Sequence, residues 1–452
     1  MSIKSLTPLD GRYESVTKPL GEFFSEWALM KYRTHVEVEW LITMAMNSSF
    51  NEVRTFTADE VQLLRNIVIN FDDEAAQKIK NIEKVTNHDV KAVEYFLRDT
   101  LSATSLADVI EFLHFSCTSE DINNLSYALM LKHGIHTVWL PAAEKLTNDV
   151  AAKAEELKDV AMLAHTHGQS ASPTTMGKEL AVFVYRWNRQ LKQIRSLEYL
   201  GKFNGAVGNY NAHYIAYPKV DWQNVSKTFV EGLGLVHNPL TTQIESHDYV
   251  AEAFHAINRF NNIVLDFDRD MWLYISLGYF KQKTISGEVG SSTMPHKVNP
   301  IDFENSEANM GLSNALLDHL ANKLPISRLQ RDLSDSSAQR NIGSAIGYSH
   351  IALSYATKGF AKTLINNHAV ESHLTGAWEV LSEAVQTVMR KNGHTNAYDK
   401  LKEITRGKAI TEIEIRQFIT TIELPAADKA RLLELTPEKY IGLAVDLLKH
   451  IK

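Results

Sequence analysis

The 452-residue sequence has little of what would place it in several common classes of protein. Its single cysteine, Cys117, makes a disulfide framework within the chain impossible. The 47 basic and 54 acidic residues are evenly mixed, and no basic tract or tail predicts a nucleic-acid partner. The apolar run 271–280 is far short of a membrane span of roughly 20 residues, and the N-terminus lacks the apolar core of a signal peptide. We therefore expect a soluble, cytoplasmic protein with neither a nucleic-acid nor a membrane partner.

Proline is also scarce, and its spacing is informative. There are 11 prolines, and none falls between Pro19 and Pro141, between Pro173 and Pro218, or between Pro239 and Pro295. Because a helix interior tolerates proline poorly, these gaps permit long helices.

Hydrophobic periodicity predicts the same architecture. Apolar residues recur at steps of three or four from Met176 to Leu197, and again from Val250 to Tyr274 over more than three heptads. Further helices are expected over about 302–321 and 339–364, and strand-like alternation is scarce. The pattern indicates an all-α fold with a central bundle of long helices.

The apolar spacing divides the chain into three parts. Residues 1–108 contain shorter amphipathic segments, and 109–367 contain the long helices. After about residue 368 the spacing restarts with a helix expected to end at Gly393. We expect an N-terminal helical domain over 1–108, a central bundle domain over 109–367 and a C-terminal helical domain over 368–452.

The stretch Gly290–Pro300, within a loop over 283–300, is the hardest part of the chain to explain as scaffold. Its sequence is GSSTMPHKVNP, in which hydroxyl side chains follow a glycine and precede a His-Lys pair. Asn299 can cap a following helix, and Pro300 can occupy its first turn. A flexible, hydroxyl-rich and cationic loop that ends at a helix N-terminus is suited to gripping an anion.

Four polar islands interrupt the helical pattern elsewhere, and each has a structural alternative. Asp10–Tyr13 could bind an anion or form a solvated turn, and Thr86–Asp89 could orient a histidine or start a helix capped by Asn87. Cys117–Asn124 suits a ligand contact and a helix N-terminus equally, although the spacing from Ser119 to Ile122 lacks a capping box.

The fourth island, His165–Gln169, could supply a general acid, or it could be two histidines hydrogen-bonded in a buried turn. A metal site there lacks a supporting carboxylate or cysteine. The acidic motif Asp266–Asp270 lies within a helical period, and the better interpretation of it is a solvated face.

Together these segments resemble a known family. GSSTMPHKVNP resembles the signature of the fumarase/aspartase superfamily. DGRY, TNHDVKAVEYF, CTSEDINN, THGQ, GAVGNYNAH, TTQIESHD and LQRDLSDSSAQR resemble the bacterial branch of its adenylosuccinate lyase family, over residues 5–450. One departure is Ser170, where the family usually has proline after THGQ; it removes no functional side chain, and we expect full activity.

The resemblance implies a reaction and an assembly. It implies elimination of fumarate from adenylosuccinate to give AMP, and from the succinylated aminoimidazole carboxamide ribotide (SAICAR) to give AICAR, in purine biosynthesis. It also implies a three-domain lyase that works as a homotetramer, with one central bundle and active sites shared between subunits. No cofactor or metal is called for, because the reaction is redox-neutral and no dinucleotide fingerprint is present.

The resemblance also assigns roles to residues. Ser291 would be the general base, His167 the general acid, and Lys297 and Asn299 would stabilise the charge that develops on the carboxylate. A serine base requires activation by nearby donors and cations. His88 would contact the substrate and support His167. The remaining expected substrate contacts are Arg12, Tyr13, Asn87, Asp89, Thr118, Ser119, Gln243, Ser292, Val298, Asn305, Arg331, Ser336 and Arg340.

Two other functions are weighed against this one. A sister lyase such as argininosuccinate lyase shares the signature loop, but His296 and the expected phosphate contacts Arg12, Arg331 and Arg340 argue against it. A non-catalytic helical scaffold would be free to lose Ser291, His167 or Lys297, and all three are present.

Overall fold

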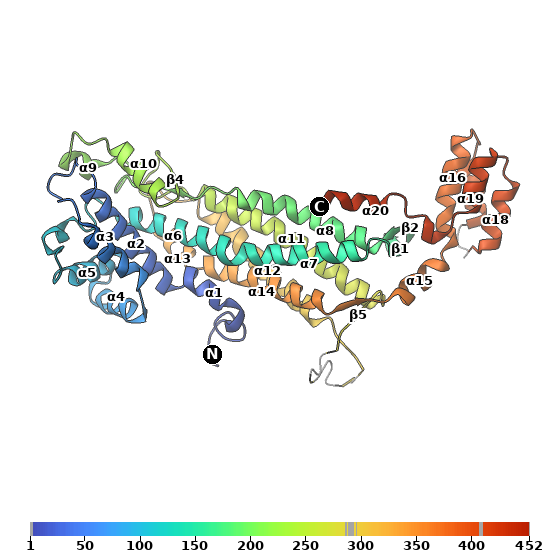
Figure 1. Ribbon diagram of the computed structural model, residues 1–452, viewed down its shortest axis with the longest axis horizontal. Helices are drawn as coiled ribbons and strands as arrows, with labels where there is room; N and C mark the ends of the chain where they lie inside the picture. The colour runs from blue at the N-terminus through green and yellow to red at the C-terminus, as the bar shows by residue number, and fades with distance from the viewer. Residues whose placement is uncertain (1–2, 285–286, 288–292, 295, 406–409, 452) are drawn as a thin grey trace. The chain divides into compact units, whose positions relative to one another are not determined.

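The computed structural model describes residues 3–284, 287, 293–294, 296–405 and 410–451. It is mainly helical, with three small two-stranded sheets in the described part (Figure 1). The helices are α1 (Glu14–Phe24), α2 (Glu26–Ala45), α3 (Ala58–Ile69), α4 (Asp73–Thr86), α5 (Asp89–Leu101), α6 (Ser119–Gly134), α7 (Leu140–Glu156), α8 (Met176–Arg195), α9 (Asn211–Ala216), α10 (Trp222–Gly232), α11 (Asp248–Ser276), α12 (Ile301–Lys323), α13 (Ser334–Gln339), α14 (Ile342–Ala361), α15 (Asn367–Thr375), α16 (Ser382–Lys391), α17 (Ala397–Thr405), α18 (Glu412–Thr421), α19 (Ala426–Leu433) and α20 (Ala444–Leu447). The strands are β1 (Ala161–Thr166), β2 (Gln169–Thr175), β3 (Leu200–Gly201), β4 (Val236–His237), β5 (Phe280–Gln282) and β6 (Thr363–Ile365).

The chain forms two compact units. Unit 1 comprises Met1–Ala143, Gln190–Asn262 and Ala308–Ser354, and unit 2 comprises Glu144–Arg189, Ile263–Glu307 and Tyr355–Lys452. The expected division into three domains stays a prediction.

In unit 1 the long helices pack through aromatic and hydrogen-bonded contacts. Trp139 lies in a π-helical turn, Ile135–Trp139, and its ring contacts Phe260 of α11 edge to face, 5.3 Å between centroids. The Trp139 indole donates to Ser349 Oγ at 2.7 Å, and this hydroxyl donates to Asn261 at 2.9 Å. Helices α11 and α14 are therefore held by apolar packing and by a buried polar network.

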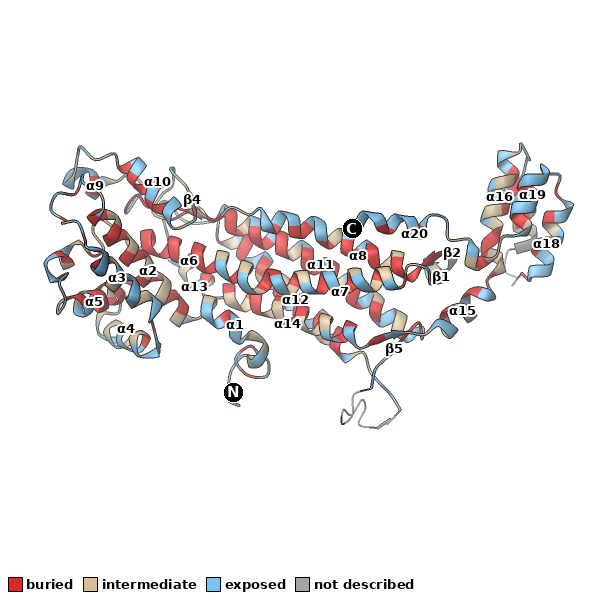
Figure 2. Cartoon of the chain, viewed as in Figure 1, coloured by how far each residue is buried: buried red, intermediate tan, exposed pale blue. Residues whose placement is uncertain are grey.

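In unit 2 the corresponding centre is Phe267 of α11, which is fully buried. Its ring lies 5.4 Å from that of Phe183, 5.3 Å from Trp187 and 5.5 Å from Phe360. These contacts join α11 to α8 and α14, which confirms the expected bundle. Figure 2 shows buried and exposed residues alternating along these helices, as a helical period requires.

Three details of the expected helices are corrected. Helix α12 begins at Ile301, so Pro300 rather than Asn299 holds the cap position, and its carbonyl accepts from Phe303 and Glu304. The helix expected over 339–364 is α13 followed by α14, with a break at 340–341. Residues 363–365 instead form β6, because these β-branched and apolar residues pair antiparallel with β5.

The acidic motif in α11 is also different from the expected solvated face. Asp268 is 1% exposed, and burial raises the pKa of its carboxyl well above the usual range. Ser306 of α12, also buried, opposes this shift. The motif therefore places one carboxyl inside unit 2 while Asp266 remains at the surface.

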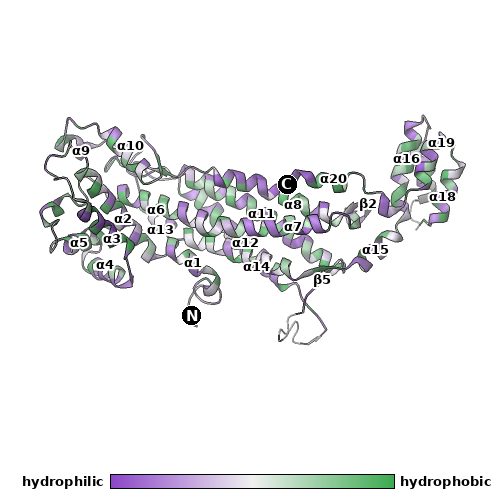
Figure 3. Ribbon diagram, viewed as in Figure 1, coloured by the Kyte–Doolittle hydropathy of each residue, from purple (hydrophilic) through white to green (hydrophobic). Residues whose placement is uncertain are grey.

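Hydropathy along the helices is mixed (Figure 3). Among the described residues, no helix is long and apolar enough to cross a membrane.

Candidate active site

Unusual backbone conformations gather at the sequence motifs. Eight described residues other than glycine have positive φ: Asn87, His114, Ser116, His167, Tyr210, His247, Leu329 and Asn396. All except Asn396 lie within a motif or up to three residues before one. A side chain other than glycine in this region costs free energy, so such residues concentrate where a site dictates the backbone.

The first island forms the turn before α1. Tyr13 N–H donates to the carbonyl of Pro8 at 2.9 Å, and the Arg12 side chain is exposed. Gly11 is buried, and an added Cβ would lie 3.3 Å from Ser5 and from the Thr7 carbonyl. The turn therefore presents the Arg12 guanidinium to solvent. This exposure fits both an anion contact and a solvated turn, the two alternatives for this island.

The second island joins α4 to α5 and assigns the cap differently from the sequence. Asn87 ends α4 in the left-handed conformation, whereas His88 is the N-cap of α5. The His88 Nδ1 accepts from the backbone N–H of Lys91 at 3.1 Å. An accepting Nδ1 leaves the proton of the neutral ring on Nε2, so exposed His88 presents a donor to its surroundings.

Asp89 lies between two arginines. Its Oδ2 is 2.8 Å from Arg33 Nη2 and 3.3 Å from Arg340 Nη2. Burial disfavours the ionised form of Asp89, but Arg33 and Arg340 outweigh it and lower the pKa of the carboxyl. Arg340 also contacts Glu26 at 2.6 Å, so this guanidinium is held at a fixed place beside α2.

The third island is a helix N-terminus. Thr118 N–H donates to Asp121 Oδ2 at 2.8 Å, so the capping box is Thr118 and Asp121 and not the Ser119 and Ile122 spacing considered from the sequence. Asp121 is fully buried and pairs with fully buried Lys202 at 2.9 Å. This ion pair ties Thr118 and Ser119 to the GAVGNYNAH segment, whose Gly205 N–H donates to Asp121 Oδ1 at 3.2 Å.

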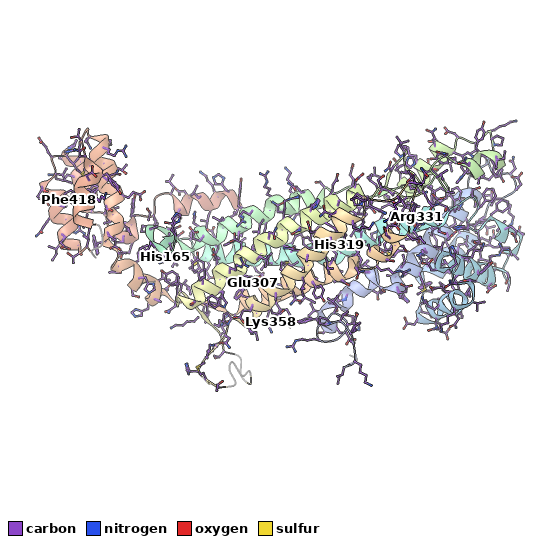
Figure 4. All side chains as sticks on the ribbon, turned by 180° about the vertical axis from the view of Figure 1, so that it is seen from behind. His165, Glu307, His319, Arg331, Lys358 and Phe418 are labelled. Carbon is purple, nitrogen blue, oxygen red and sulfur yellow. The ribbon has the colours of Figure 1, made fainter. Side chains whose placement is uncertain are left out.

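Arg331 is surrounded by acceptors. Its Nη2 lies 2.9 Å from Glu120 Oε1, and its Nη1 donates to Gln243 Oε1 at 3.2 Å. Asp335 Oδ2 is 3.7 Å from the Arg331 Nε. The Asp335 carboxylate also accepts from the backbone N–H of Ser336 at 2.6 Å. Figure 4 labels Arg331 among the side chains of unit 1.

The fourth island is the tip of the β1–β2 hairpin in unit 2. His167 and Gly168 have φ of 54° and 73°, the conformations of a two-residue type I′ turn between the paired residues Thr166 and Gln169. His165, labelled in Figure 4, and His167 are both exposed, so the alternative of two buried histidines is wrong.

Ser170 lies opposite His165 in this hairpin. In a two-residue hairpin this second pair does not exchange backbone hydrogen bonds, so the proline expected from the resemblance would fit there as well as Ser170 does. No group of three metal-ligating side chains occurs among the described residues.

The signature loop is described in part. Ser291 and Ser292 lie outside the described residues. Lys297 and Val298 are exposed, and the Val298 carbonyl accepts from Gln282 Nε2 at 2.9 Å. Asn299 and Asn305 are half-buried, before and within α12.

The structure brings together one subset of the expected contacts. In unit 1, Asp89 contacts Arg340, and Gln243 contacts Arg331. Unit 1 also carries Arg12, Tyr13, Asn87, His88, Thr118, Ser119 and Ser336, and unit 2 carries His167, Lys297, Val298, Asn299 and Asn305.

Sequence reasoning missed the buried residue Arg33, and it included Glu120 and Asn123 in the third island without giving either a role. A signal was available for Arg33: with Glu37 it places charged residues four apart in α2 among mostly apolar neighbours.

Known proteins similar to this chain have the same kind of helical fold and indicate the expected family. Residues 11–316 match the family described as "Lyase", and 327–441 match "Adenylosuccinate lyase C-terminal". The structure resembles 3-carboxy-cis,cis-muconate lactonizing enzyme from Pseudomonas putida (TM-score 0.73, 20% identity, 96% of each chain). It also resembles fumarate lyase from Mesorhizobium sp. BNC1 (TM-score 0.74, 16% identity, 96% of this chain and 97% of that one). The fold is thus the helical fold that these enzymes share.

Sequence relatives narrow the assignment. Proteins named adenylosuccinate lyase are 53% identical in Haemophilus influenzae, over 100% of this chain and 99% of theirs, and 52% identical in Escherichia coli K12, over the same shares. The chain belongs to the adenylosuccinate lyase family.

Proposed function

We propose that the chain eliminates fumarate from adenylosuccinate to give AMP, and from SAICAR to give AICAR, in purine biosynthesis. The observation that carries this proposal is the 52–53% identity over the full length of relatives named for the first reaction. The match of residues 327–441 to an adenylosuccinate lyase C-terminal region supports the same substrate.

The reaction needs a base and an acid. A proton leaves the carbon beside a succinyl carboxylate, its electrons form the new double bond, the carbon–nitrogen bond breaks, and the nitrogen takes a proton. Ser291 takes the first proton and His167 donates the second. Lys297 and Asn299 stabilise the negative charge that builds up on the carboxylate. The exposed turn at the tip of the β1–β2 hairpin suits His167 for reaching a ligand.

Unit 1 supplies the nucleotide contacts in this proposal. The guanidinium groups of Arg12, Arg331 and Arg340 bind the phosphate, since such forks match phosphate oxygens. His88 offers its Nε2 proton to the substrate and supports His167. The remaining expected substrate contacts, from both units, are Tyr13, Asn87, Asp89, Thr118, Ser119, Gln243, Ser292, Val298, Asn305 and Ser336.

The chain acts as a cytoplasmic homotetramer in which subunits share active sites. Large apolar side chains that are exposed on the long helices support self-association. They include Tyr185 at 59%, Trp272 at 41% and Leu312 at 52%.

Purified protein tests the reaction directly. Adenylosuccinate consumption, followed by ultraviolet absorbance, should be rapid, and fumarate release from argininosuccinate should be absent. The reverse result would assign the chain to the sister lyase. Protein that binds AMP and releases no fumarate would indicate a non-catalytic scaffold.

Two substitutions test the catalytic pair. Ser291→Ala and His167→Gln should each lower kcat by about 100- to 10,000-fold while substrate still binds. His165→Gln, a neighbouring exposed histidine, is the matched control and should keep near-normal kcat. A Ser291→Ala variant with normal kcat would refute the base. An intact high-pH limb of the pH–rate profile in His167→Gln would refute the acid, because that limb reports loss of the acid's proton.

A further inference from the structure

The expected nucleotide contacts of unit 1 are joined by buried polar side chains that do not belong to that set. Arg33 of α2 is the first of these, and it is only 2% exposed. Two of its guanidinium nitrogens bond to different residues: Nη2 lies 2.8 Å from Asp89 Oδ2, and Nε donates to Asn123 Oδ1 at 2.9 Å. Arg33 thereby links Asp89, and through it Arg340, to α6.

Asn123 and Glu120 continue the connection along α6. Asn123 is 8% exposed, and its Nδ2 donates to Glu120 Oε1 at 2.8 Å. The same oxygen of Glu120, a residue that is 2% exposed, lies 2.9 Å from Arg331 Nη2. One carboxylate oxygen therefore fixes both the amide and the guanidinium.

Arg331 also contacts Gln243, the last of the expected nucleotide contacts in this series. Its Nη1 donates to Gln243 Oε1 at 3.2 Å, and Gln243 Nε2 donates to the carbonyl of Ala206 at 2.9 Å. The polar contacts therefore run without a break from Arg340 to the segment after β3. These contacts involve six separate stretches of the sequence.

Burial makes this chain of contacts specific. A buried polar group that loses its partner keeps its desolvation cost, so each member strongly favours the arrangement in which all are bonded. Arg33 and Asn123 each bond in two directions, and neither can move without breaking a contact to a neighbour.

We propose that Arg33, Asn123 and Glu120 form a relay that positions the nucleotide contacts Asp89, Arg340, Arg331 and Gln243. The three are positioning residues, since they act through the side chains that would touch the ligand. The proposal rests on the proposed function, because that assigns the four contacts to the nucleotide. It adds that their geometry is set jointly rather than at each residue alone.

The relay predicts that substitutions at two of its members have non-additive effects on KM. Residues that act independently would have additive effects on the free energy of binding. Asn123→Leu and Glu120→Leu should each raise the KM for adenylosuccinate by about tenfold, equivalent to about 1.4 kcal/mol, and change kcat by less than about threefold. The double variant should also raise KM by only about tenfold, because either substitution already breaks the relay. Independent residues would instead multiply to about a hundredfold.

Calorimetric AMP binding should follow the same pattern, with a tenfold weaker Kd for each single variant and for the double. Glu120→Gln is the conservative variant: its side-chain oxygen still accepts from Asn123 and Arg331, and KM should stay within about threefold of wild type. Arg33→Met should raise KM as much as Asn123→Leu does. Removal of the buried charge can unfold the chain. If Arg33→Met unfolds, the KM values of Asn123→Leu and Glu120→Gln decide the proposal.

Arg54→Met is the matched control. Arg54 also bridges carboxylates in unit 1, pairing with Glu60 at 2.7 Å and Asp108 at 2.8 Å, yet it contacts none of the relay residues. Arg54→Met should lower Tm about as much as the relay variants do, yet leave the KM for adenylosuccinate unchanged.

The outcomes separate the relay from the proposed function. Wild-type protein that cleaves adenylosuccinate, with Asn123→Leu folded and its KM unchanged, overturns the relay alone. Multiplicative effects in the double variant, or an Arg54→Met effect on KM of similar size, also overturn it. If wild-type protein does not cleave adenylosuccinate but binds AMP, the function fails and AMP binding tests the relay. Protein that does neither overturns both.

Discussion

Asp121 and Lys202 are both fully buried, and their ion pair holds two of the sequence motifs together. The pair has additional partners: Lys202 Nζ donates to the Gly205 carbonyl at 2.9 Å, and Asp121 accepts from the backbone of Thr118 and Asn204. Such bonding offsets the cost of removing two charges from water. Because both residues are buried, replacing one of them by an apolar residue would leave the other as an uncompensated charge.

Lys202→Met should therefore strongly destabilise the protein. Leaving the Asp121 carboxylate buried without its partner should cost about 3–5 kcal/mol, and thermal or denaturant unfolding would measure it. Lys145→Met, which removes an exposed pair with Asp149, should change stability by less than about 1 kcal/mol. Equal effects of the two substitutions would contradict the role given to burial.

His213 is a second buried ionisable residue, and it makes stability depend on pH. Burial lowers the pKa of its imidazole to about 4, Asp121 opposes this shift, and neither ring nitrogen has a hydrogen-bond partner among the described residues. In the unfolded chain the ring gains a proton below about pH 6.5, whereas the folded protein resists protonation until about pH 4. The unfolded state therefore binds more protons in this window, and stability falls as pH falls through it.

His213→Phe should remove this part of the acid sensitivity. The ring would still pack against Phe203 and Trp222, and the variant should gain about 2 kcal/mol over wild type at pH 5 relative to pH 7.5. The drop in Tm between these two pH values should be smaller in the variant. Some drop should remain, because burial also lowers the pKa of His247 to about 4. An unchanged drop would show that folding does not lower the proton affinity of His213.

At the scale of elements, the β1–β2 hairpin carries the proposed acid on a turn with two positive φ values. Nothing lies within 4 Å of a Cβ added at Gly168, so the turn itself, and not packing, requires glycine there. The position of the His167 side chain thus depends on the local backbone conformation.

Gly168→Ala should separate this conformational demand from overall stability. The strained backbone should cost about 1–2 kcal/mol, and displacement of His167 should lower kcat by about ten- to a hundredfold. Gly376→Ala, in the same unit at a φ of −84° and with open space around it, should leave both kcat and Tm unchanged. A Gly168→Ala variant with full kcat would show that the turn does not set the acid's position.

At the scale of the whole molecule, the proposed catalytic residues come from segments far apart in the sequence. His167 belongs to the 144–189 segment of unit 2, and His88 belongs to unit 1. Dispersed residues of this kind are compatible with the proposed tetramer, in which one active site draws on several subunits.

Mixing inactive variants tests this arrangement. Ser291→Ala and His167→Gln subunits, unfolded and refolded together, should recover about a quarter of wild-type activity if the two residues come from different subunits. Light scattering should report a mass four times the 51.0 kDa of one chain. Recovery near zero in a confirmed mixed tetramer would place both residues on the same subunit.

Sequence alone was sufficient for features with a local or repeated signal. The periodic apolar positions of α8 and α11 determine those helices, since the residues of one helix face follow each other at fixed steps. Gly393, with a φ of 79°, ends the segment that the spacing predicted. The motifs also named Asp89, Gln243, Arg331 and Arg340 as substrate contacts, and that role stays a prediction.

Tertiary structure decided what depends on distant residues. Sequence spacing did not reveal that Asp268 is buried, that 280–282 pairs with 363–365, or that Arg33, Asn123 and Glu120 connect the expected nucleotide contacts. The physical reason is that burial and hydrogen bonding depend on which segments pack together, and one segment's periodicity carries no record of its partner. The sequence by itself determined the long helices and the family; the fold decided which buried side chains contact the expected site residues.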